Sequence, residues 1–390
     1  MRIAVACLSL NTLGGAERLC VRFLRALEKT DWEVTVVTID KTNWMLLEKS
    51  LDIHLRPMKE FYLFKTMPEL PTLTLQQGFL VLLHVLELFL FSVKGRYDLL
   101  ANMRGEVVDS FGDIVYFNAM PLKLMHIYPQ IQPTQDSKWA IYGRLLSLLT
   151  KFFKGSQRIF VANSKFTKYI IERHFRRMAA VVYPPVELKK IRSCPSIGHR
   201  ENTVVAISRF RLAKELEKIP EIAKLAENCR FVIIGSSDRN SEECLRVISK
   251  RARELGVHKR VEIFENMPFD FVLENLFAAK VYLHTQPTEA FGIAIVEAMA
   301  AGCVPVVPRD GGPWLDILEQ HQGKYGFSYA TLEEAADYIR TLLENEQLRT
   351  EISKRAQKRA MNFESSLFEE RIQGIVRAVL KAKSKDIGST

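Results

Sequence analysis

The sequence predicts an α/β protein of two domains, each built around a doubly wound parallel sheet. Three observations support this prediction. Apolar β-type runs alternate with amphipathic stretches along most of the chain, which is the β-α-β order of parallel sheets with right-handed crossovers. The alternation stops at Tyr183-Pro184-Pro185-Val186 and restarts at Thr203. The length of 390 residues also exceeds one ordinary core and suits two domains.

The first half contains the elements of one such sheet. Arg2–Leu8 predicts a buried strand and not a secretory leader, because the run is short and no small-residue cleavage site follows it. Ala16–Leu27 has its large apolar residues at helical spacing, which predicts an amphipathic helix. The other strands expected in this half are Glu33–Ile39, Asp98–Asn102, Ile114–Phe117 and Arg158–Ala162.

The stretch Leu75–Val93 is the most apolar in the chain, but it includes His84 and Glu87. A membrane-spanning helix needs about 20 predominantly apolar residues. We therefore expect a buried or interfacial helix here. Whether it contacts a membrane stays open at the level of sequence.

The second half repeats the alternation and predicts a second sheet. Its expected strands are Thr203–Ser208, Arg230–Gly235, Val261–Phe264, Val281–Thr285 and Val304–Pro308, and its expected helices are Glu215–Glu227, Glu242–Leu255, Val272–Ala278 and Ile293–Ala301. After Leu332 we expect helices without strands, ending in a basic tail. The predicted domains are residues 1–185 and 201–365, with a linker over 186–200 and a C-terminal helix or tail over 366–390 that packs back on the N-terminal domain.

Charge and cysteine usage limit the possible partners and the compartment. The net charge is +10, and residues 138–177 hold ten basic side chains against one acidic side chain, Glu172. Such a patch favours lipid headgroups, diphosphates or nucleic acid, although a solvated helix face explains it equally well. The six cysteines form no C-x-x-C pair, which indicates reduced thiols in a cytoplasmic protein.

The strongest local motif runs from Thr288 to Gly302, after an expected strand and into an expected helix. Gly292 allows the backbone to approach a ligand, and a helix start presents N–H groups to an anion. Glu289 and Glu297 are eight residues apart, at most about 12 Å along a helix axis. Carboxylates at that spacing can take the sugar and ribose hydroxyls of a nucleotide sugar whose diphosphate meets the helix start. The alternative is a solvated glutamate pair beside a packing helix.

Two weaker motifs also follow expected strands. Arg209 and Lys214 lie in a strand-to-helix loop, where two cations can neutralise a diphosphate leaving group. Arg211 would point elsewhere in an extended loop. Gly14 and Gly15 permit close approach of a phosphate or sugar, although a Gly-Gly pair marks only a turn in most proteins.

Taken together, these motifs resemble glycosyltransferase family 4. The matching pieces are Gly14-Gly15-Ala16-Glu17, Arg209-x4-Lys214, Asn163-Ser164-Lys165-Phe166-Thr167, Tyr183-Pro184-Pro185-Val186, the segment Glu289–Val307 and Asp310-Gly311-Gly312-Pro313, in the family's order over about residues 1–365. The resemblance is to the branch that holds the α-1,2-mannosyltransferases of dolichol-linked oligosaccharides and their prokaryotic relatives. It implies the GT-B architecture, in which two Rossmann-like domains face an interdomain cleft.

The resemblance also implies a role for each motif residue. Glu289 would face hydroxyls of the donor sugar, and Glu297 would hold the ribose. Backbone N–H groups of Phe291, Gly292 and Ile293 would lie by the diphosphate and sugar. The implied diphosphate ligands are Arg209 and Lys214, and the implied lining of the donor–acceptor junction is Gly14 and Gly15. The family retains anomeric configuration by a front-face attack, so no second carboxylate is required as a nucleophile.

The acceptor side departs from the family's pattern. Close members carry Tyr-x-His followed by proline, whereas this chain has Asn118 at the histidine position. Asn118 cannot accept a proton, so His126 is the candidate to orient or polarise the acceptor, although a lone histidine is more often structural. Arg104 is a weaker acceptor-side candidate. The chain has no D-x-D pattern, so we expect no bound metal and no cofactor, with the nucleotide sugar as substrate.

The sequence therefore predicts retaining transfer of a hexose (mannose, glucose or N-acetylhexosamine) from a GDP- or UDP-sugar to a lipid-linked or membrane-proximal glycan. The basic patch and the amphipathic stretch Tyr142–Lys154 favour peripheral docking on the cytoplasmic face of an anionic membrane. A non-catalytic sugar-nucleotide binder is the alternative, because of Asn118. A nucleic-acid-binding protein is the other class, but no recognised motif accompanies the patch, so we expect no nucleic-acid partner.

Overall fold

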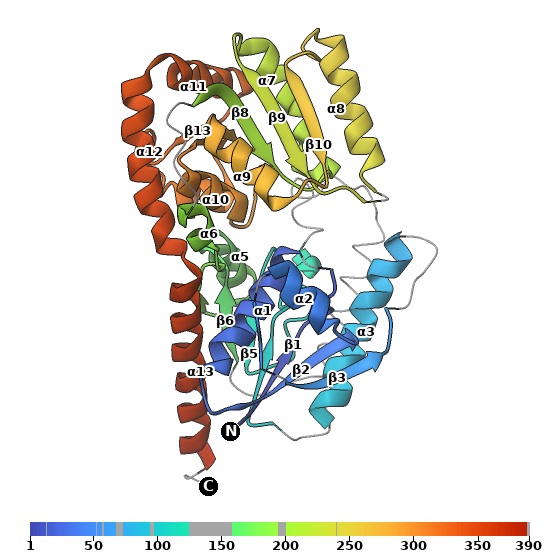
Figure 1. Cartoon of the computed structure of the whole chain (residues 1–390). Helices are drawn as coiled ribbons and strands as arrows, with labels where there is room; N and C mark the ends of the chain where they lie inside the picture. Colours follow the sequence, from blue (N-terminus) through green and yellow to red (C-terminus); the bar gives the residue numbers. More distant parts are fainter. Residues whose placement is uncertain are drawn as a thin grey trace. The chain divides into compact units, whose positions relative to one another are not determined.

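The structure is a computed structural model, which describes residues 1–12, 14–51, 53–56, 58–67, 73–93, 97–124, 158–193, 200–238 and 240–387. The chain divides into two compact units (Figure 1). Unit 1 is Met1–Pro185 together with Ser365–Thr390, and unit 2 is Val186–Glu364. The second unit is therefore continuous in sequence, while the first is completed by the end of the chain.

Unit 1 is built on a parallel sheet whose strands have the order β3-β2-β1-β4-β5-β6-β7. Continuous apolar runs form the central strands, since both faces of a parallel sheet are covered by helices. β3 and β7 lie at the two edges, and neither was expected from the sequence. The strands are β1 (Arg2–Ala6), β2 (Glu33–Asp40), β3 (Lys59–Phe64), β4 (Leu99–Asn102), β5 (Ile114–Phe117), β6 (Ile159–Ala162) and β7 (Ala179–Val181).

The unit 1 helices cover this sheet. α1 spans Gly15–Glu28 and buries the apolar face that its sequence predicts, including Leu19 and Phe23. Ser164 caps α5 by accepting a hydrogen bond from the Thr167 N–H, the usual way of satisfying a first-turn donor. The other helices described in this unit are α2 (Trp44–Leu51), α3 (Leu73–Val93), α5 (Lys165–Phe175) and α13 (Ser365–Ile387), with a short 3₁₀ turn at Leu122–Leu124.

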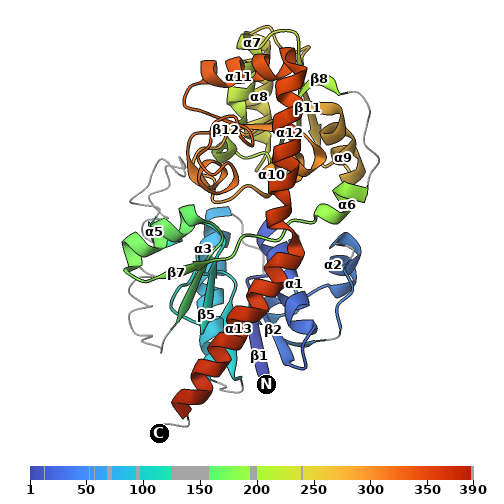
Figure 2. The same cartoon turned by 90° about the vertical axis from the view of Figure 1, so that its left-hand side faces the viewer.

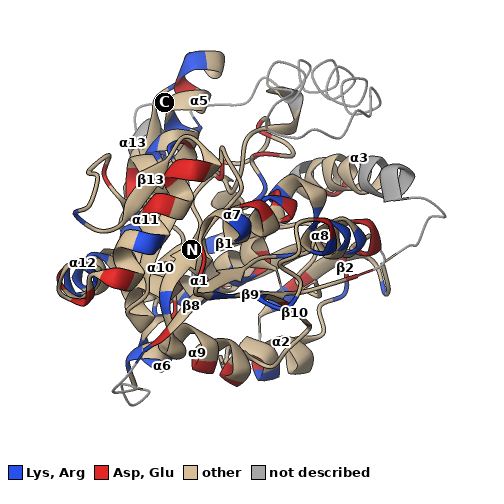
Figure 3. Ribbon diagram, turned by 90° about the horizontal axis from the view of Figure 1, so that it is seen from above, with Lys and Arg blue, Asp and Glu red and all other residues tan. Residues whose placement is uncertain are grey.

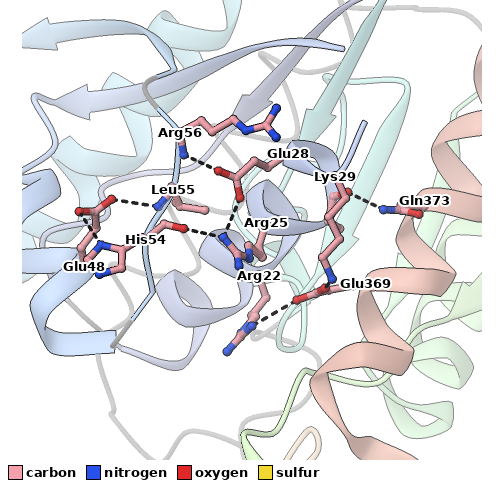
Figure 4. Close-up of polar contacts among 11 residues, drawn as sticks. Arg22, Arg25, Glu28, Lys29, Glu48, His54, Leu55, Arg56, Glu369 and Gln373 are labelled. Carbon is pink, nitrogen blue, oxygen red and sulfur yellow. Dashed lines mark hydrogen bonds and ion pairs between the residues drawn. The ribbon is translucent and has the colours of Figure 1, made fainter. Parts of the chain in front are cut away.

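Helix α13 belongs to unit 1 although it follows unit 2 in sequence. It runs along α1 (Figure 2), and Phe368, Ile372 and Val376 are buried in the same core as the α1 residues. Figure 4 shows the polar part of the contact, in which Glu369 lies between Arg22 of α1 and Lys29, the residue that follows α1. Its Oε1 lies 3.2 Å from Nη1 of Arg22, and its other oxygen pairs with Lys29. Apolar burial and a shared carboxylate thus both fix α13 on α1.

Helix α3 contains the apolar stretch Leu75–Val93. Its sequence contains one acidic residue, Glu87, and no Lys or Arg, so the described part of the helix is largely tan in Figure 3. One side is buried, whereas Leu82, Leu86, Phe89 and Leu90 are 38 to 46% exposed. Among the described residues, no helix is long and apolar enough to cross a membrane. The helix therefore combines a face packed on the sheet with an exposed apolar stripe.

Unit 2 contains a second parallel sheet, with the order β10-β9-β8-β11-β12-β13. Its strands are β8 (Glu201–Ile207), β9 (Arg230–Gly235), β10 (Val261–Glu265), β11 (Ala279–Leu283), β12 (Val304–Pro308) and β13 (Phe327–Tyr329). Its helices are α6 (Leu188–Ser193), α7 (Ile219–Leu225), α8 (Glu242–Glu254), α9 (Phe269–Ala278), α10 (Ile293–Ala301), α11 (Leu332–Glu344) and α12 (Glu346–Ala360). The predicted class, two doubly wound parallel sheets, is confirmed.

Two segments of unit 2 differ from expectation. The helix expected over Glu215–Glu227 is two 3₁₀ turns followed by α7, which starts at Ile219 because Pro220 fits a helix's first turn. The stretch 186–200, expected as a linker, includes α6, whose Leu188 and Ile191 are buried. Residues 194–199 lie outside the described part of the chain.

Each sheet reverses its strand order at one point, between β1 and β4 in unit 1 and between β8 and β11 in unit 2. Loops that leave the carboxyl ends of such neighbouring strands diverge to opposite faces of the sheet. The crevice between them is the usual ligand site of an open α/β sheet. These two points are therefore where the candidate residues of both units should lie.

Candidate functional site

In unit 2, the loop after β8 is held against the neighbouring strand β9. The Ser208 N–H donates to Ile234 O (3.1 Å), and the Phe210 N–H donates to Ser236 O (3.0 Å), with the Phe210 ring fully buried. A Cβ on Gly235 would lie 2.1 Å from Ser208 O. Only glycine therefore permits this close approach, which fixes the loop that carries Arg209 and Lys214.

The three basic residues of this loop separate as predicted for an extended segment. Arg211 pairs with Asp238, with Nη1 to Oδ1 at 2.6 Å. Arg209 is exposed and, within the described part of the chain, pairs with no carboxylate. Lys214 lies at the end of a 3₁₀ turn, and its carbonyl accepts a hydrogen bond of 2.8 Å from the Thr285 hydroxyl. That bond ties the β8 loop to the loop after β11.

The loop after β11 carries Glu289 and is packed backbone to backbone on the loop after β12. The Gly312 N–H donates to Glu289 O at 2.7 Å. A Cβ on Gly312 would lie 2.2 Å from Ala290 O. Thr288 has φ +53°, a left-handed conformation that is rare for a β-branched residue and that costs backbone strain. The Asp310-Gly311-Gly312-Pro313 motif thus shapes the backbone that presents Glu289.

Lys214 and Glu289 form an ion pair at the edge between β8 and β11. Nζ lies 2.6 Å from Oε2 of Glu289, both side chains are 19% exposed, and Nζ also contacts Gln286 Oε1. Burial by itself would raise the pKa of Glu289, but the ammonium of Lys214 lowers it to about 2. The carboxylate is therefore ionised at any physiological pH, so it accepts hydrogen bonds and does not donate a proton.

His284 shares this site, and sequence reasoning missed it. It directly follows β11 and is 7% exposed, and its Nε2 lies 4.0 Å from Oε2 of Glu289. Burial and the nearby Lys214 lower the pKa of His284 to about 4, so the ring is neutral at pH 7. Its position after the strand was the available signal, since no motif includes it.

The glycine-started helix of the motif is α10. Gly292 has φ +98° and precedes the helix at Ile293, while the Phe291 ring is buried edge-on against Phe363 with centroids 5.2 Å apart. Because the ring is buried, only the backbone N–H of Phe291 can take the predicted role beside the diphosphate and sugar. Glu297 is half-buried on α10, and burial together with the carboxylates of Glu297 and Glu289 raises the pKa of Tyr282. Both glutamates thus act on the same buried tyrosine of β11.

In unit 1, the corresponding switch point holds Arg104 between two carboxylates. Nη1 lies 3.2 Å from Oε1 of Glu17 and Nε lies 2.7 Å from Oε1 of Glu106. The Asn118 N–H donates to Oε2 of Glu106 at 3.2 Å, and its side-chain amide donates to Met103 O at 2.6 Å. The acceptor-side candidates Arg104 and Asn118 are therefore connected through Glu106.

The positive charge of Arg104 stabilises the ionised form of Glu106. Burial raises the pKa of Glu106, and the guanidinium of Arg104 opposes that rise. The paired glycines lie nearby, since a Cβ on Gly14 would approach Oε2 of Glu17 to 2.6 Å. Gly15 begins α1 and is exposed. His126 lies outside the described residues, as does the stretch Tyr142–Lys154.

A metal site was not expected. Within the described residues, no three His, Cys, Asp or Glu side chains lie close enough to hold a metal ion. Metal independence remains a prediction for experiment.

The family model described as "Glycosyl transferases group 1" matches residues 189–359. The chain is similar to a GDP-Man:Man(3)GlcNAc(2)-PP-Dol alpha-1,2-mannosyltransferase of Dictyostelium discoideum, 28% identical over 272 residues, which cover 64% of this chain and 53% of the relative. The chain spans about half the length of the curated relatives it matches.

Two solved structures are similar over almost the whole chain. Sucrose-phosphate synthase from Thermosynechococcus elongatus superposes with a TM-score of 0.76 at 16% identity, covering 98% of this chain and 100% of that chain. Anabaena Alr3699/HepE in complex with UDP and glucose gives a TM-score of 0.70 at 17% identity, covering 97% and 100%. The predicted resemblance is confirmed: residues 189–359 match a group 1 glycosyltransferase domain, and the two parallel-sheet units match solved GT-B structures.

Proposed function

We propose that this chain is a metal-independent retaining glycosyltransferase that moves a hexose from a GDP- or UDP-sugar to a lipid-linked or membrane-proximal glycan. The observation that carries the proposal is the Lys214–Glu289 pair at the β8–β11 switch point, beside the glycine-started helix α10. The domain match supports glycosyl transfer. The Dictyostelium relative uses GDP-Man by its name, and Alr3699/HepE was solved with UDP and glucose.

The proposed division of labour follows from the charges. Glu289, held ionised, accepts hydrogen bonds from hydroxyls of the sugar, and Glu297 accepts those of the ribose. Lys214 has three ammonium hydrogens, of which Gln286 and Glu289 take two among the described residues. The third is directed to a phosphate oxygen, which exposed Arg209 and the N–H groups at the start of α10 also contact. These cations stabilise the departing nucleotide as negative charge develops on it.

On the acceptor side, we propose the cluster of Arg104, Glu106 and Asn118, together with Gly14 and Gly15 at the junction. Arg104 is held in place there by ion pairs with two carboxylates, those of Glu17 and Glu106. None of these residues is proposed as a nucleophile, because front-face retention uses the leaving phosphate to take the acceptor proton. His126 remains a candidate to orient the acceptor.

A membrane-proximal acceptor requires contact with the cytoplasmic surface of a bilayer, and unit 1 offers two suitable helices. α5 presents Lys165, Arg173 and Arg176 to solvent, with Tyr169 56% exposed on the same helix. Cationic residues with an exposed aromatic ring suit an anionic headgroup region. The exposed stripe of α3 adds apolar area for shallow insertion. We propose peripheral docking through these faces.

The test uses the full-length chain. A thermal-shift panel of GDP, UDP and their sugars identifies the donor, because a ligand that binds only the folded state raises the melting temperature. Turnover is then followed as nucleotide release with a lipid-linked oligosaccharide acceptor, with and without EDTA, and the anomeric configuration of the product is read by NMR. Glu289→Ala and Lys214→Ala should abolish turnover. Arg211→Ala, in the same loop but paired with Asp238, is the matched control and should retain it.

The outcomes separate the proposal from its alternative. Full activity in Glu289→Ala or Lys214→Ala would overturn the site assignment. Donor binding without turnover, over a broad panel of acceptors, would instead favour a non-catalytic sugar-nucleotide binder, which Asn118 makes the second candidate.

A further inference from the structure

His284 is held in one place by backbone contacts on both sides. Its N–H donates to Val306 O at 2.9 Å, and its carbonyl accepts a hydrogen bond of 2.8 Å from the Tyr329 hydroxyl. The side chain is 9% exposed and lies at the carboxyl edge of the unit 2 sheet. The backbone of His284 is therefore fixed at the same edge of the sheet as Glu289.

The two ring nitrogens have different surroundings. The ring forms a hydrogen bond with the Gln286 backbone, and this bond raises the pKa of His284. A bond that raises the pKa of a histidine is one in which a ring N–H donates to a carbonyl. Nε2 has no hydrogen-bond partner among the described residues although it is buried, so the bond to Gln286 is made by Nδ1. In a neutral ring with its proton on Nδ1, Nε2 carries the lone pair. It is therefore a hydrogen-bond acceptor that lacks a donor.

The carboxylate beside Nε2 is itself an acceptor. Oε2 of Glu289 lies 4.0 Å away and is already bonded to Lys214. Two acceptors at this separation cannot satisfy each other, and leaving a buried acceptor unpaired is costly. A hydroxyl placed beside them can donate its hydrogen to Nε2, while its oxygen accepts from a neighbouring cation. A second, adjacent hydroxyl can donate to the carboxylate of Glu289.

We propose that His284 is a specificity-determining residue for the donor, and that its Nε2 accepts a hydrogen bond from one hydroxyl of a vicinal pair on the hexose. Glu289 takes the other hydroxyl of the pair. This inference rests on the proposed function, since it assigns a further contact within the same donor site. Both hydrogen bonds are made by hydroxyls of the hexose, and none by the base, ribose or phosphates of the nucleotide.

The experiment combines a change in the enzyme with a change in the substrate. The wild-type full-length chain, His284→Leu and His284→Gln are assayed with the donor that the wild type turns over fastest, for example GDP-mannose, and with its singly deoxygenated hexose analogues. We expect His284→Leu to lower kcat/KM for the parent donor about tenfold. For one analogue, which lacks the hydroxyl bound by Nε2, wild type and His284→Leu should be equally slow. His284→Gln, whose amide oxygen is an acceptor, should regain part of the loss for the parent donor.

Two readouts distinguish this role from a structural one. The affinity for GDP or UDP alone and the melting temperature should change little in either variant. If His284→Leu slows the parent donor and every deoxygenated analogue by the same factor, the residue is structural and the proposal is wrong. The proposal is also overturned if His284→Leu has no effect on any donor. If the wild type turns over no nucleotide sugar, the proposed function itself fails and this inference fails with it.

Discussion

Removing the ammonium of Lys214 should destabilise unit 2 through Glu289. In Lys214→Met, the carboxylate keeps its buried position but loses the partner that holds its pKa at about 2. Burial, the largest influence on this pKa, is then opposed only by His284 and the Ala290 N–H, so the pKa rises from about 2. A buried charge without its partner is strongly unfavourable. The variant should therefore be less stable wherever Glu289 is ionised in the unfolded chain.

The pKa gives the magnitude. A fall from 4.5 to about 2 corresponds to about 3 kcal/mol in favour of the folded state at pH 7, at about 1.4 kcal/mol for each pH unit. Because the folded pKa is the lower one, this stability is present above pH 4.5 and is lost as the pH falls towards 2. Lys214→Met should thus lose up to about 3 kcal/mol at pH 7, whereas the difference from wild type should shrink to about 1 kcal/mol or less at pH 3.

Unit 2 must be followed separately, because a two-unit chain need not unfold in one step. Trp314 lies in unit 2, next to the loop that packs on Glu289. In a background where the other three tryptophans are phenylalanine, its fluorescence reports urea unfolding of this unit. The titrations compare wild type and Lys214→Met in that background at pH 7 and pH 3.

A double variant provides the control. Lys214→Met with Glu289→Gln removes both charges, so it should be more stable at pH 7 than Lys214→Met alone. The reasoning is refuted if the two variants are equally stable, or if Lys214→Met loses the same free energy at both pH values.

Three further predictions test other parts of the fold. Gly312→Ala should weaken donor binding and destabilise unit 2 by about 1–3 kcal/mol, because its Cβ would lie 2.2 Å from Ala290 O. Gly374→Ala is the control, since its Cβ would have nothing within 4 Å, and it should leave stability unchanged or raise it. Calorimetry measures the stability of both variants. Ile372→Ala, fully buried between α13 and α1, should cost unit 1 about 2–5 kcal/mol in urea titrations followed by Trp32 and Trp44, and a cost below 1 kcal/mol would contradict this packing. Leu86→Glu should reduce sedimentation with anionic phospholipid vesicles while GDP affinity stays unchanged, and undiminished vesicle binding would exclude the α3 stripe as a docking face.

The sequence predicted the central strands because burial on both faces demands a continuous apolar run, as in Glu33–Asp40. It missed β3, β7 and β13, which are edge strands. An edge strand has one neighbour, and β7 and β13 have three residues each, too few for any periodicity to appear. The start of α7 was also misplaced, since local turn formation around Glu215, at φ +52°, competes with the helix.

The candidate donor site could be predicted in part. Arg209, Lys214, Glu289 and Gly292 each follow a strand within a recognisable motif, but only the sheet order makes β8 and β11 neighbours and brings Lys214 to Glu289. His284 could not be found in this way, because its importance comes from a 4.0 Å approach and not from a local pattern. Unit 1 is similar, since Glu106 connects Arg104 with Asn118 only in three dimensions.

The placement of α13 has a consequence for synthesis on the ribosome. Unit 2 is one uninterrupted segment, Val186–Glu364, and all its residues are made before α13. Unit 1 lacks Phe368, Ile372 and Val376 until unit 2 has been made, although its strands precede unit 2. Domains usually fold in the order in which they are made. Here unit 1 is made before unit 2 but completes its core after it, so the apolar residues of α1 that α13 covers stay uncovered while unit 2 is being translated.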